Sequence, residues 1–486
     1  MRNNSLKKGL SLFCLPFIFV VSCTGAMPDK AQRIDEFVRL CHEYRIFDGT
    51  VLVSEDGRII YNKSYGLASR EWNVPNELDS KYIIGSISKQ FTAMLMLQLA
   101  QEDKLNLNGK ISEYLPDFPK DKGDLITIHH LLCHSSGIPN NMDHFENWYT
   151  EMWFREYSTQ ELIELFYDTE LEFSPGTSFA YSNTGYYICA AIIEKVTGKL
   201  YEDVLKERIL QPLEMKNSGL MDSYNIVPRM TTGYTYWNFA YSKPPQANPS
   251  SSRGAGSIYS TAEDLLKWDR ALAEYALVSK NFQDLMFLPQ INLRGGRDYG
   301  YGVVLGEEPI TGLNISISFA EHTGNQPGFS CLLFRIPDED HSIIVLSNID
   351  HMDLRIMKQG LLNLLYDQEA GLEKPISLVL AECATLEEIQ AAIGNFRISN
   401  SEYSIRRDAV NGLGFRFLRN KKKDIGLAVL EFNAEEHPRS PWAYESLAEA
   451  CLLSGDNLKA IKNLEKVLEL DPENGRIKEK LAGLKK

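Results

Sequence analysis

The sequence predicts an α+β fold, in which a mainly antiparallel sheet is flanked by helices and carries a large helical insertion, followed by an all-α helical-repeat domain. A β-hairpin pattern stands near the N-terminus, further strand patterns return only after residue 300, and a 34-residue period marks the tail. Consecutive strands after a long helical segment favour antiparallel pairing over alternating βαβ units.

Length and composition indicate a folded protein of two or three units. The chain has 486 residues, of which 44% are hydrophobic and 24% are charged. This balance is typical of globular rather than disordered proteins. The formal net charge is −14. Because an acidic surface repels phosphate backbones, we expect no nucleic-acid partner.

The N-terminal segment is predicted to be a signal peptide over residues 1–22. Basic residues precede an apolar run at residues 10–21, which is too short to cross a bilayer comfortably. Cys23 then ends a stretch that resembles a bacterial lipobox, which predicts a lipid anchor to the membrane at this cysteine. Ordinary cleavage nearby, for instance after Ala26, is the alternative. In both cases we expect an exported protein of the cell envelope or periplasm.

The first folded domain is predicted to span residues 23–370. Apolar runs on both sides of Asp56-Gly57, a strong turn signal, predict a hairpin over residues 49–63. Apolar residues at helical spacing predict a helix over residues 88–101. The later elements are helices and loops at about 120–290, strands at 301–305, 314–319, 329–335 and 342–347, and a closing helix at 352–366.

The tail at residues 410–486 carries an internal repeat and follows a helical connector at residues 371–409. Leu413 and Leu447 are 34 residues apart, and Gly455 stands where two paired helices would need a turn. This pattern resembles the tetratricopeptide repeat. Because two repeats are fewer than a solenoid usually needs, we expect them to pack on neighbouring helices and to offer a concave face to a protein partner.

Ser86 and Lys89 are the first candidate catalytic residues. They stand three positions apart at the start of a predicted helix, so their side chains share one face. A serine becomes a good nucleophile only when a neighbour takes its proton, and the N-terminus of a helix favours developing negative charge. The spacing alone is weak, because a surface serine near a lysine would also match it.

Tyr181 and Asn183 form the second candidate motif, which precedes an apolar helical stretch. A tyrosine close to an amine can relay a proton between a serine and a leaving group. An asparagine amide can hold a substrate carbonyl.

His322 opens the third motif, His322-Thr323-Gly324, which follows the strand pattern at 314–319. A basic side chain there would place positive potential over the site, although an imidazole with an unperturbed pKa of about 6.5 can also be neutral. Gly324 would permit close backbone approach, and the N–H of Asn325 could face an oxyanion. Alone, His322 would be an ordinary turn histidine.

In this chain order the three motifs resemble those of the serine β-lactamase and penicillin-binding-protein superfamily. Flanking stretches at 85–93, 126–137 and 256–265 are similar to those of the class C β-lactamase, D-aminopeptidase and esterase branch. The resemblance covers about residues 31–370 and implies a β-lactamase/transpeptidase-like fold. It implies Ser86 as acylated nucleophile, Lys89 and Tyr181 as its general-base pair, Asn183 as a substrate contact, and the N–H groups of Ser86 and Asn325 as oxyanion hole.

The resemblance implies a serine hydrolase that acts on an ester, amide or peptide bond of a small-molecule or peptide substrate through an acyl-enzyme. His322 takes the place of a lysine whose charge would bind the carboxylate of penicillins, so we expect an esterase or D-amino-acid peptidase. A true β-lactamase or D,D-carboxypeptidase is the alternative. A catalytically silent receptor or scaffold that acts through the repeats is the alternative of another class.

We expect neither a cofactor nor a metal ion. His130 and His134 could share a helix face and bind a metal, which is the minor alternative. However, no carboxylate stands at the spacing of a zinc-protease motif, and the family-like flank accounts for the same stretch.

Overall fold

The computed structural model describes residues 29–148, 150–237, 239–350, 352–399 and 403–485. The predicted signal peptide and the lipidation at Cys23 lie outside these residues. Within the described ranges, no helix is long and apolar enough to span a bilayer.

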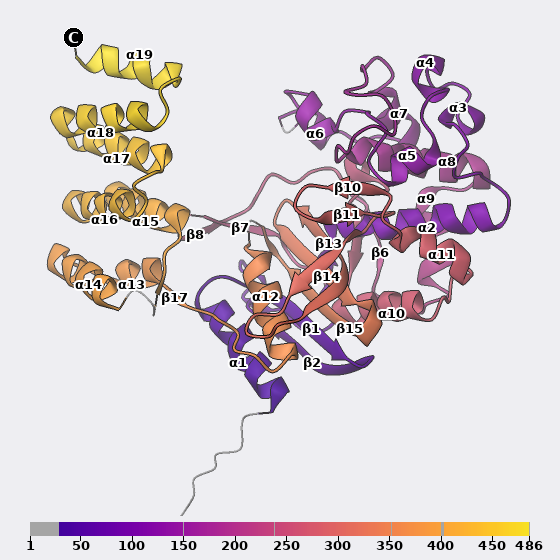
Figure 1. Ribbon diagram of the computed structural model, residues 1–486, viewed down its shortest axis with the longest axis horizontal. Coiled ribbons are helices and arrows are strands. Elements are labelled where there is room, and N and C mark those ends of the chain that lie inside the picture. The colour runs from indigo at the N-terminus through magenta and orange to yellow at the C-terminus, as the bar shows by residue number, and fades with distance from the viewer. Residues whose placement is uncertain (1–28, 149, 238, 351, 400–402, 486) are drawn as a thin grey trace, which may run out of the picture.

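An antiparallel sheet of eight strands forms the centre of the described chain (Figure 1). The first two strands of the chain, β1 (Gly49–Glu55) and β2 (Arg58–Tyr65), form a hairpin that turns at Asp56-Gly57, as the sequence predicts. Val51 lies opposite Val345, so the hairpin pairs with β15 (His341–Ser347), a strand distant in the sequence. The strand order is β10 (Ile291–Leu293), β11 (Arg297–Tyr299), β12 (Val304–Pro309), β13 (Ser316–Gln326), β14 (Phe329–Ile336), β15 (His341–Ser347), β1 (Gly49–Glu55) and β2 (Arg58–Tyr65).

Helices cover both faces of the sheet. On one face α1 (Lys30–Glu43) and α12 (Leu354–Leu365) pack against alternate strand residues such as Val53. Leu52 points to the opposite face and joins a larger core. Because successive strand residues point to opposite faces, each inner strand contributes to both cores. The larger core contains α2 (Ser88–Gln101), α8 (Asn183–Thr197) and α10 (Ala262–Ala273).

The predicted helical insertion lies between β2 and β10, and α2 has the bounds that its apolar spacing predicts. The other helices of the insertion are α3 (Ile111–Tyr114), α4 (Lys120–Gly123), α5 (Ile128–Leu132), α6 (Asn141–His144), α7 (Thr159–Glu164), α9 (Tyr201–Leu205) and α11 (Lys280–Phe287). Its short strands are β3 (Leu67–Ser69), β4 (Val74–Pro75), β5 (Tyr82–Ile83), β6 (Gly219–Leu220), β7 (Tyr234–Trp237), β8 (Ala240–Ser242) and β9 (Ile258–Ser260).

The C-terminal region is a stack of paired helices beside the sheet (Figure 1). Gly455 follows α17 (Pro441–Ser454) with φ of +85°, which is the turn predicted from the repeat. Their assignment to the tetratricopeptide family stays a prediction. The helices are α13 (Ile376–Glu382), α14 (Leu386–Ile398), α15 (Arg407–Arg419), α16 (Lys423–Glu436), α17 (Pro441–Ser454), α18 (Asn457–Leu470) and α19 (Gly475–Leu484).

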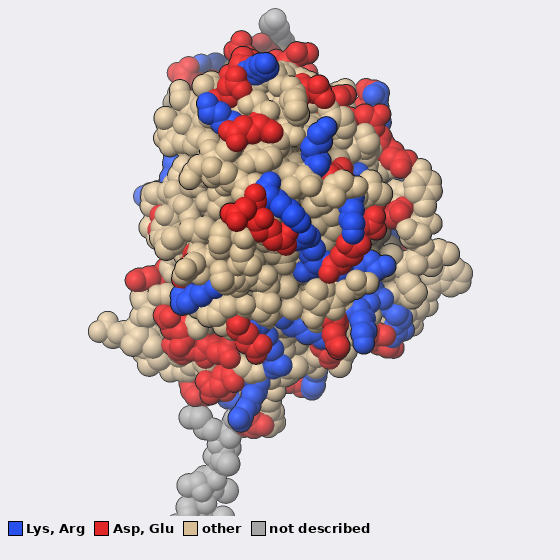
Figure 2. Space-filling model, turned by 90° about the vertical axis from the view of Figure 1, so that its right-hand side faces the viewer, with Lys and Arg blue, Asp and Glu red and all other residues tan. Residues whose placement is uncertain are grey.

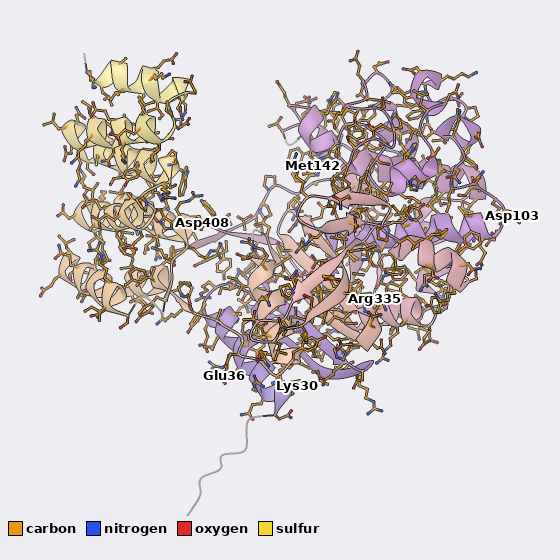
Figure 3. All side chains as sticks on the ribbon, viewed as in Figure 1. Lys30, Glu36, Asp103, Met142, Arg335 and Asp408 are labelled. Atoms are coloured by element: carbon orange, nitrogen blue, oxygen red, sulfur yellow. The ribbon has the colours of Figure 1, made fainter. Side chains whose placement is uncertain are left out.

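The hairpin formed by β7 and β8 connects the helical stack to the sheet region. Phe239, at its turn, packs against the core shared by α13 to α16, and the guanidinium of Arg416 lies 5.6 Å from its ring. Figure 3 labels Asp408, near the start of α15, on the side of the stack that faces the sheet. Asp408 lines a small pocket there together with Tyr44 and Arg45.

Acidic and basic side chains are interspersed on the face shown in Figure 2. Such a mixed surface, on a chain with net charge −14, attracts phosphate backbones less than a continuous basic patch does. The expectation that no nucleic acid binds stays a prediction.

One strand differs from the prediction in a way that matters for the site. The pattern predicts a strand that ends at residue 319, whereas β13 continues to Gln326. The third motif therefore lies within a strand, where His322 is opposite Leu333 and Gly324 is opposite Cys331 of β14. Polar residues and glycine hide this extension in the sequence, because pairing with β14 rather than local propensity maintains the strand.

Candidate active site

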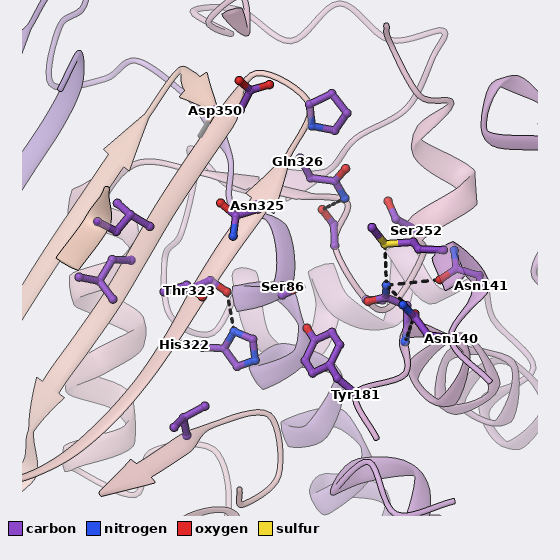
Figure 4. A pocket seen from close by; sticks show the side chains of 18 of the residues that line it. Ser86, Asn140, Asn141, Tyr181, Ser252, His322, Thr323, Asn325, Gln326 and Asp350 are labelled. Carbon is purple, nitrogen blue, oxygen red and sulfur yellow. Dashed lines mark hydrogen bonds between the residues drawn. The ribbon is translucent and has the colours of Figure 1, made fainter. Parts of the chain in front are cut away.

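Ser86 lies in the short 3₁₀ turn η1 (Gly85–Ile87) that leads into α2. It is partly exposed and borders a cleft of about 1390 Å³. Figure 4 shows Ser86, Tyr181, His322 and Asn325 around this cleft. The start of α2 places the hydroxyl where helix N–H groups favour negative charge.

Lys89 is fully buried one turn further along α2. Its Nζ lies 3.0 Å from Oγ of Ser86, 2.8 Å from Oδ1 of Asn183 and 2.9 Å from the carbonyl oxygen of Ala255. Burial lowers the pKa of Lys89 well below its ordinary value of 10.5. A neutral amine has two N–H donors, and the oxygens of Asn183 and Ala255 can accept both. Its lone pair then faces Ser86, so this arrangement can take the serine proton.

Tyr181 lies on the opposite side of Ser86, just before α8. Figure 4 shows its hydroxyl pointing towards Ser86. Burial raises the pKa of Tyr181 above its ordinary value, so its phenol stays protonated at neutral pH. The ring centroid is 4.8 Å from Nζ of Lys89. A protonated phenol in this place can donate to Ser86 or to a leaving group.

Asn183 is the first residue of α8, and neighbouring side chains orient its amide. Its Oδ1 accepts from Lys89, and its Nδ2 donates to Oδ1 of Asn140 at 3.2 Å. Asn183 and Asn140 both line the cleft. The amide thus holds the Lys89 amine, a role that the sequence did not predict, and its side chain still borders the space where a substrate would bind.

His322 lies within β13 and is only 5% exposed. Burial, with a smaller contribution from the charge of Lys89, lowers the pKa of His322 to about 3. The sequence left the charge of this residue open. Because burial disfavours the charged form, the imidazole is neutral at pH 7. The expected positive potential from His322 is therefore absent.

Gly324 brings β13 directly against the turn that carries Ser86. A Cβ atom at Gly324 would lie 1.8 Å from the carbonyl oxygen of Ile84 and 3.2 Å from N of Ser86, and a Cβ atom at Gly85 would lie 2.6 Å from N of Asn325. The close approach predicted for Gly324 is therefore present. It brings the N–H groups of Ser86 and Asn325 into one region, which two donors to an oxyanion require.

Comparisons with known proteins identify the family of this chain. A family model of beta-lactamases matches residues 31–365. The chain belongs to the beta-lactamase family. Penicillin-binding protein 4* of Bacillus subtilis is 31% identical over 337 residues, which cover 66% of this chain and 72% of that protein.

Two solved structures agree with the beta-lactamase-family assignment. A penicillin-binding protein from Bacillus halodurans is 25% identical with a TM-score of 0.57, and the match covers 64% of this chain and 94% of that one. The octameric penicillin-binding protein homologue from Pyrococcus abyssi is 27% identical with a TM-score of 0.63, covering 72% and 81%. This beta-lactamase-family protein is thus a serine hydrolase with the predicted fold.

His134 and Tyr299 belong to this beta-lactamase-family site, although the sequence did not predict them as site residues. Nε2 of His134 lies 3.1 Å from the hydroxyl of Tyr299, which lies 3.0 Å from Nε2 of His322. The sequence indicated His134 only as a possible metal ligand, and Tyr299 belongs to none of the three motifs. Among the described residues, no three His, Cys, Asp or Glu side chains are grouped as metal ligands would be.

Replacing Gly324 by alanine is expected to destabilise this beta-lactamase-family protein and to lower its activity. The new Cβ would collide with backbone at Ile84, so β13 or the Ser86 turn must move, at a cost of about 1–3 kcal/mol. Urea unfolding and turnover of an ester would measure both effects. Gly394→Ala is the control, because a Cβ there meets no atom within 4 Å. Equal behaviour of the two variants would contradict the close approach.

Proposed function

We propose that this protein hydrolyses an ester, amide or peptide bond through an acyl-enzyme on Ser86, as an esterase or D-amino-acid peptidase. The observation that supports this most is the set of contacts of Lys89. Its buried amine meets two oxygens that can accept its two N–H groups, and its third neighbour is the Ser86 hydroxyl. A neutral amine next to a hydroxyl is the arrangement that activates a serine nucleophile.

In the proposed acylation, Ser86 gives its proton to Lys89 as Oγ attacks the carbonyl carbon of the substrate. The N–H groups of Ser86 and Asn325 stabilise the oxyanion. Tyr181 donates its proton to the leaving group and regains one from the Lys89 ammonium, which becomes neutral again. Water then attacks the acyl-enzyme, and its proton passes to the same groups before Ser86 is released.

The neutral imidazole of His322 supports substrates without a carboxylate at that end of the cleft. A lysine in its place would carry a charge at every physiological pH, whereas His322 carries none. Short esters and amides of D-amino acids need no such charge. They are therefore the favoured substrate classes.

A D,D-carboxypeptidase or β-lactamase is the second candidate, and Arg294 favours it. Arg294 is exposed at the turn between β10 and β11 and lines the cleft. Among the described cationic side chains that line the cleft, it is the one without an ion pair. The others are paired: Lys243 with Glu71, Arg297 with Glu308 and Glu321, Arg355 with Asp353, and Lys358 with Glu308. A substrate carboxylate would find its charge partner at Arg294.

Replacing Arg294 by glutamine separates the two candidates. If the substrate is a carboxylate-bearing peptide or penicillin, kcat/KM should fall about tenfold or more, because a hydrogen bond to a charged group contributes about 1.5–3 kcal/mol. Neutral aryl esters should be hydrolysed as before. Arg419→Gln, on an exposed residue of α15, is the control. An equal response of charged and neutral substrates would remove Arg294 from substrate recognition and leave the esterase or D-amino-acid peptidase assignment.

The proposed function is tested by a panel of substrates. Hydrolysis by the wild type and by a Ser252→Ala control is measured for four substrates. These are a short-chain aryl ester, a D-amino-acid amide, a peptide ending in two D-amino acids and a penicillin. Ser252 lines the same cleft, and its hydroxyl donates instead to the carbonyl oxygen of Pro249. Preference for the ester or amide supports the proposal, and turnover of the last two substrates alone would replace it by the second candidate.

Export, the lipid anchor at Cys23 and a partner for the C-terminal repeats are proposed from the sequence. Mass spectrometry of the N-terminal peptide from the native host would detect the lipid. A receptor without catalysis would need none of the contacts among Ser86, Lys89 and Tyr181, so these contacts support an enzyme.

A further inference from the structure

A line of buried hydrogen bonds connects the second motif to the third. The backbone N–H of Ser182 donates to Nδ1 of His134 at 3.1 Å, and Nε2 of His134 lies 3.1 Å from the Tyr299 hydroxyl. That hydroxyl lies 3.0 Å from Nε2 of His322, whose Nδ1 is 2.6 Å from the carbonyl oxygen of Thr323. His134 and Tyr299 are each only 1% exposed. The line therefore begins and ends on backbone, and its three hydrogen bonds from Ser182 to His322 are buried.

The two backbone ends fix the direction of every hydrogen bond in the line. The N–H of Ser182 can only donate, so Nδ1 of His134 accepts and its proton sits on Nε2. The carbonyl of Thr323 can only accept, so Nδ1 of His322 carries the proton and Nε2 accepts. The Tyr299 hydroxyl then accepts from His134 and donates to His322. With both rings neutral, all four bonds are made at once.

We propose that His134 and Tyr299 are positioning residues that hold His322 in a single neutral tautomer and tie the backbone of the second motif to that of the third. His322 in turn fixes the Thr323 carbonyl, one peptide before the N–H of Asn325 that the proposed mechanism assigns to the oxyanion. The His134 ring also packs 4.3 Å from the Tyr181 ring. The pair thus supports both walls of the cleft, and its kinetic consequences rest on the proposed function.

A proton added to His322 would break this arrangement. Nε2 would become a donor facing the Tyr299 oxygen, and the bond that Tyr299 donates would be lost. The charge would also lie near that of Lys89 whenever the amine is protonated. Glu321 cannot compensate, because it neighbours His322 on the strand and pairs instead with Lys358 and Arg297. The titratable groups around the line are Lys89, Cys133, His134, Tyr181, Tyr186, Tyr299 and His322.

The direct test is ¹⁵N NMR of the protein labelled at its nine histidines. Spectra of His134→Gln and His322→Gln assign the two signals. The proposal predicts an Nε2–H tautomer for His134 and an Nδ1–H tautomer for His322, with neither ring titrating between pH 5 and 8. A His322 signal that titrates near pH 6.5, or that shows the other tautomer, would overturn it. This readout needs no turnover, so it can fail or succeed independently of the proposed function.

Tyr299→Phe then tests the positioning role. Loss of the hydroxyl removes the donor to Nε2, so His322 should show mixed neutral tautomers while burial still keeps it uncharged, and kcat should fall about tenfold at pH 8 with KM nearly unchanged. Tyr301→Phe is the matched control, since this buried tyrosine lies 2.8 Å from Nδ1 of His129, outside the line. The positioning role is supported if the two variants have similar free energies of unfolding and only Tyr299→Phe changes kcat and the His322 spectrum. Identical kinetics and spectra for the two variants would contradict it.

Discussion

Replacing Ser86 by alanine is expected to lower kcat/KM by about 10³-fold or more for any ester or amide that the wild type hydrolyses. The substitution removes the atom that would form the acyl bond, and neither Lys89 nor the protonated Tyr181 can replace it. Because Ser86 is partly exposed, the free energy of unfolding should change by less than about 0.5 kcal/mol. Steady-state kinetics and urea unfolding measure the two quantities.

Ser252→Ala provides the comparison for this result, because it removes a hydroxyl from the same cleft. It should retain most of the wild-type rate. Hydrolysis that survives in Ser86→Ala at the wild-type rate would show that another group is the nucleophile, or that a contaminant is being measured.

Replacing Lys89 by methionine is expected to lower kcat by about 10²- to 10⁴-fold, the range that a general base contributes. Methionine fills a similar volume without a lone pair on nitrogen. The oxygens of Asn183 and Ala255 would lose their donor, so the free energy of unfolding should also fall, by about 1–3 kcal/mol. Measuring kcat beside a urea titration separates the lost base from lost stability.

The pH profile gives the sign of this effect. Lys89 acts as a base only without its proton, so the rate should fall as pH drops through its pKa. Burial holds that pKa well below 10.5, and the acid limb should therefore lie at a lower pH than the titration of an exposed lysine. His322, with a pKa of about 3, adds no ionisation above pH 5. If the residual activity of Lys89→Met falls at low pH in the same way as that of the wild type, a group other than Lys89 causes this fall.

Local patterns predicted the elements that depend on neighbouring residues. Helical spacing located α2 with its observed bounds, and the Ser86 and Lys89 pair followed from it. The Asp56-Gly57 turn located the first hairpin, and Gly455 located a turn between tail helices. In each case the deciding residues lie within one helix or one hairpin, so the sequence contains the relevant signal.

Other parts of the site depend on residues that are distant in the chain. The amine of Lys89 donates to Asn183 and Ala255, which are 94 and 166 positions away. His134 and Tyr299 are 165 positions apart and meet only because β11 joins the sheet edge. The charge of His322 likewise follows from burial, which single-sequence spacing does not determine.

The role of Ser86 as nucleophile is tested most directly by intact-mass spectrometry of the purified protein, as wild type and as Ser86→Ala, after incubation with a fluorophosphonate, a short-chain aryl ester and a penicillin. A mass increase is expected on the wild type alone, with the fluorophosphonate adduct on the peptide that contains Ser86 and a transient acyl adduct from the ester. A penicillin adduct that persists or turns over would favour the second candidate. No adduct on the wild type with any reagent, or equal labelling of Ser86→Ala, would contradict the claim that Ser86 is an activated nucleophile.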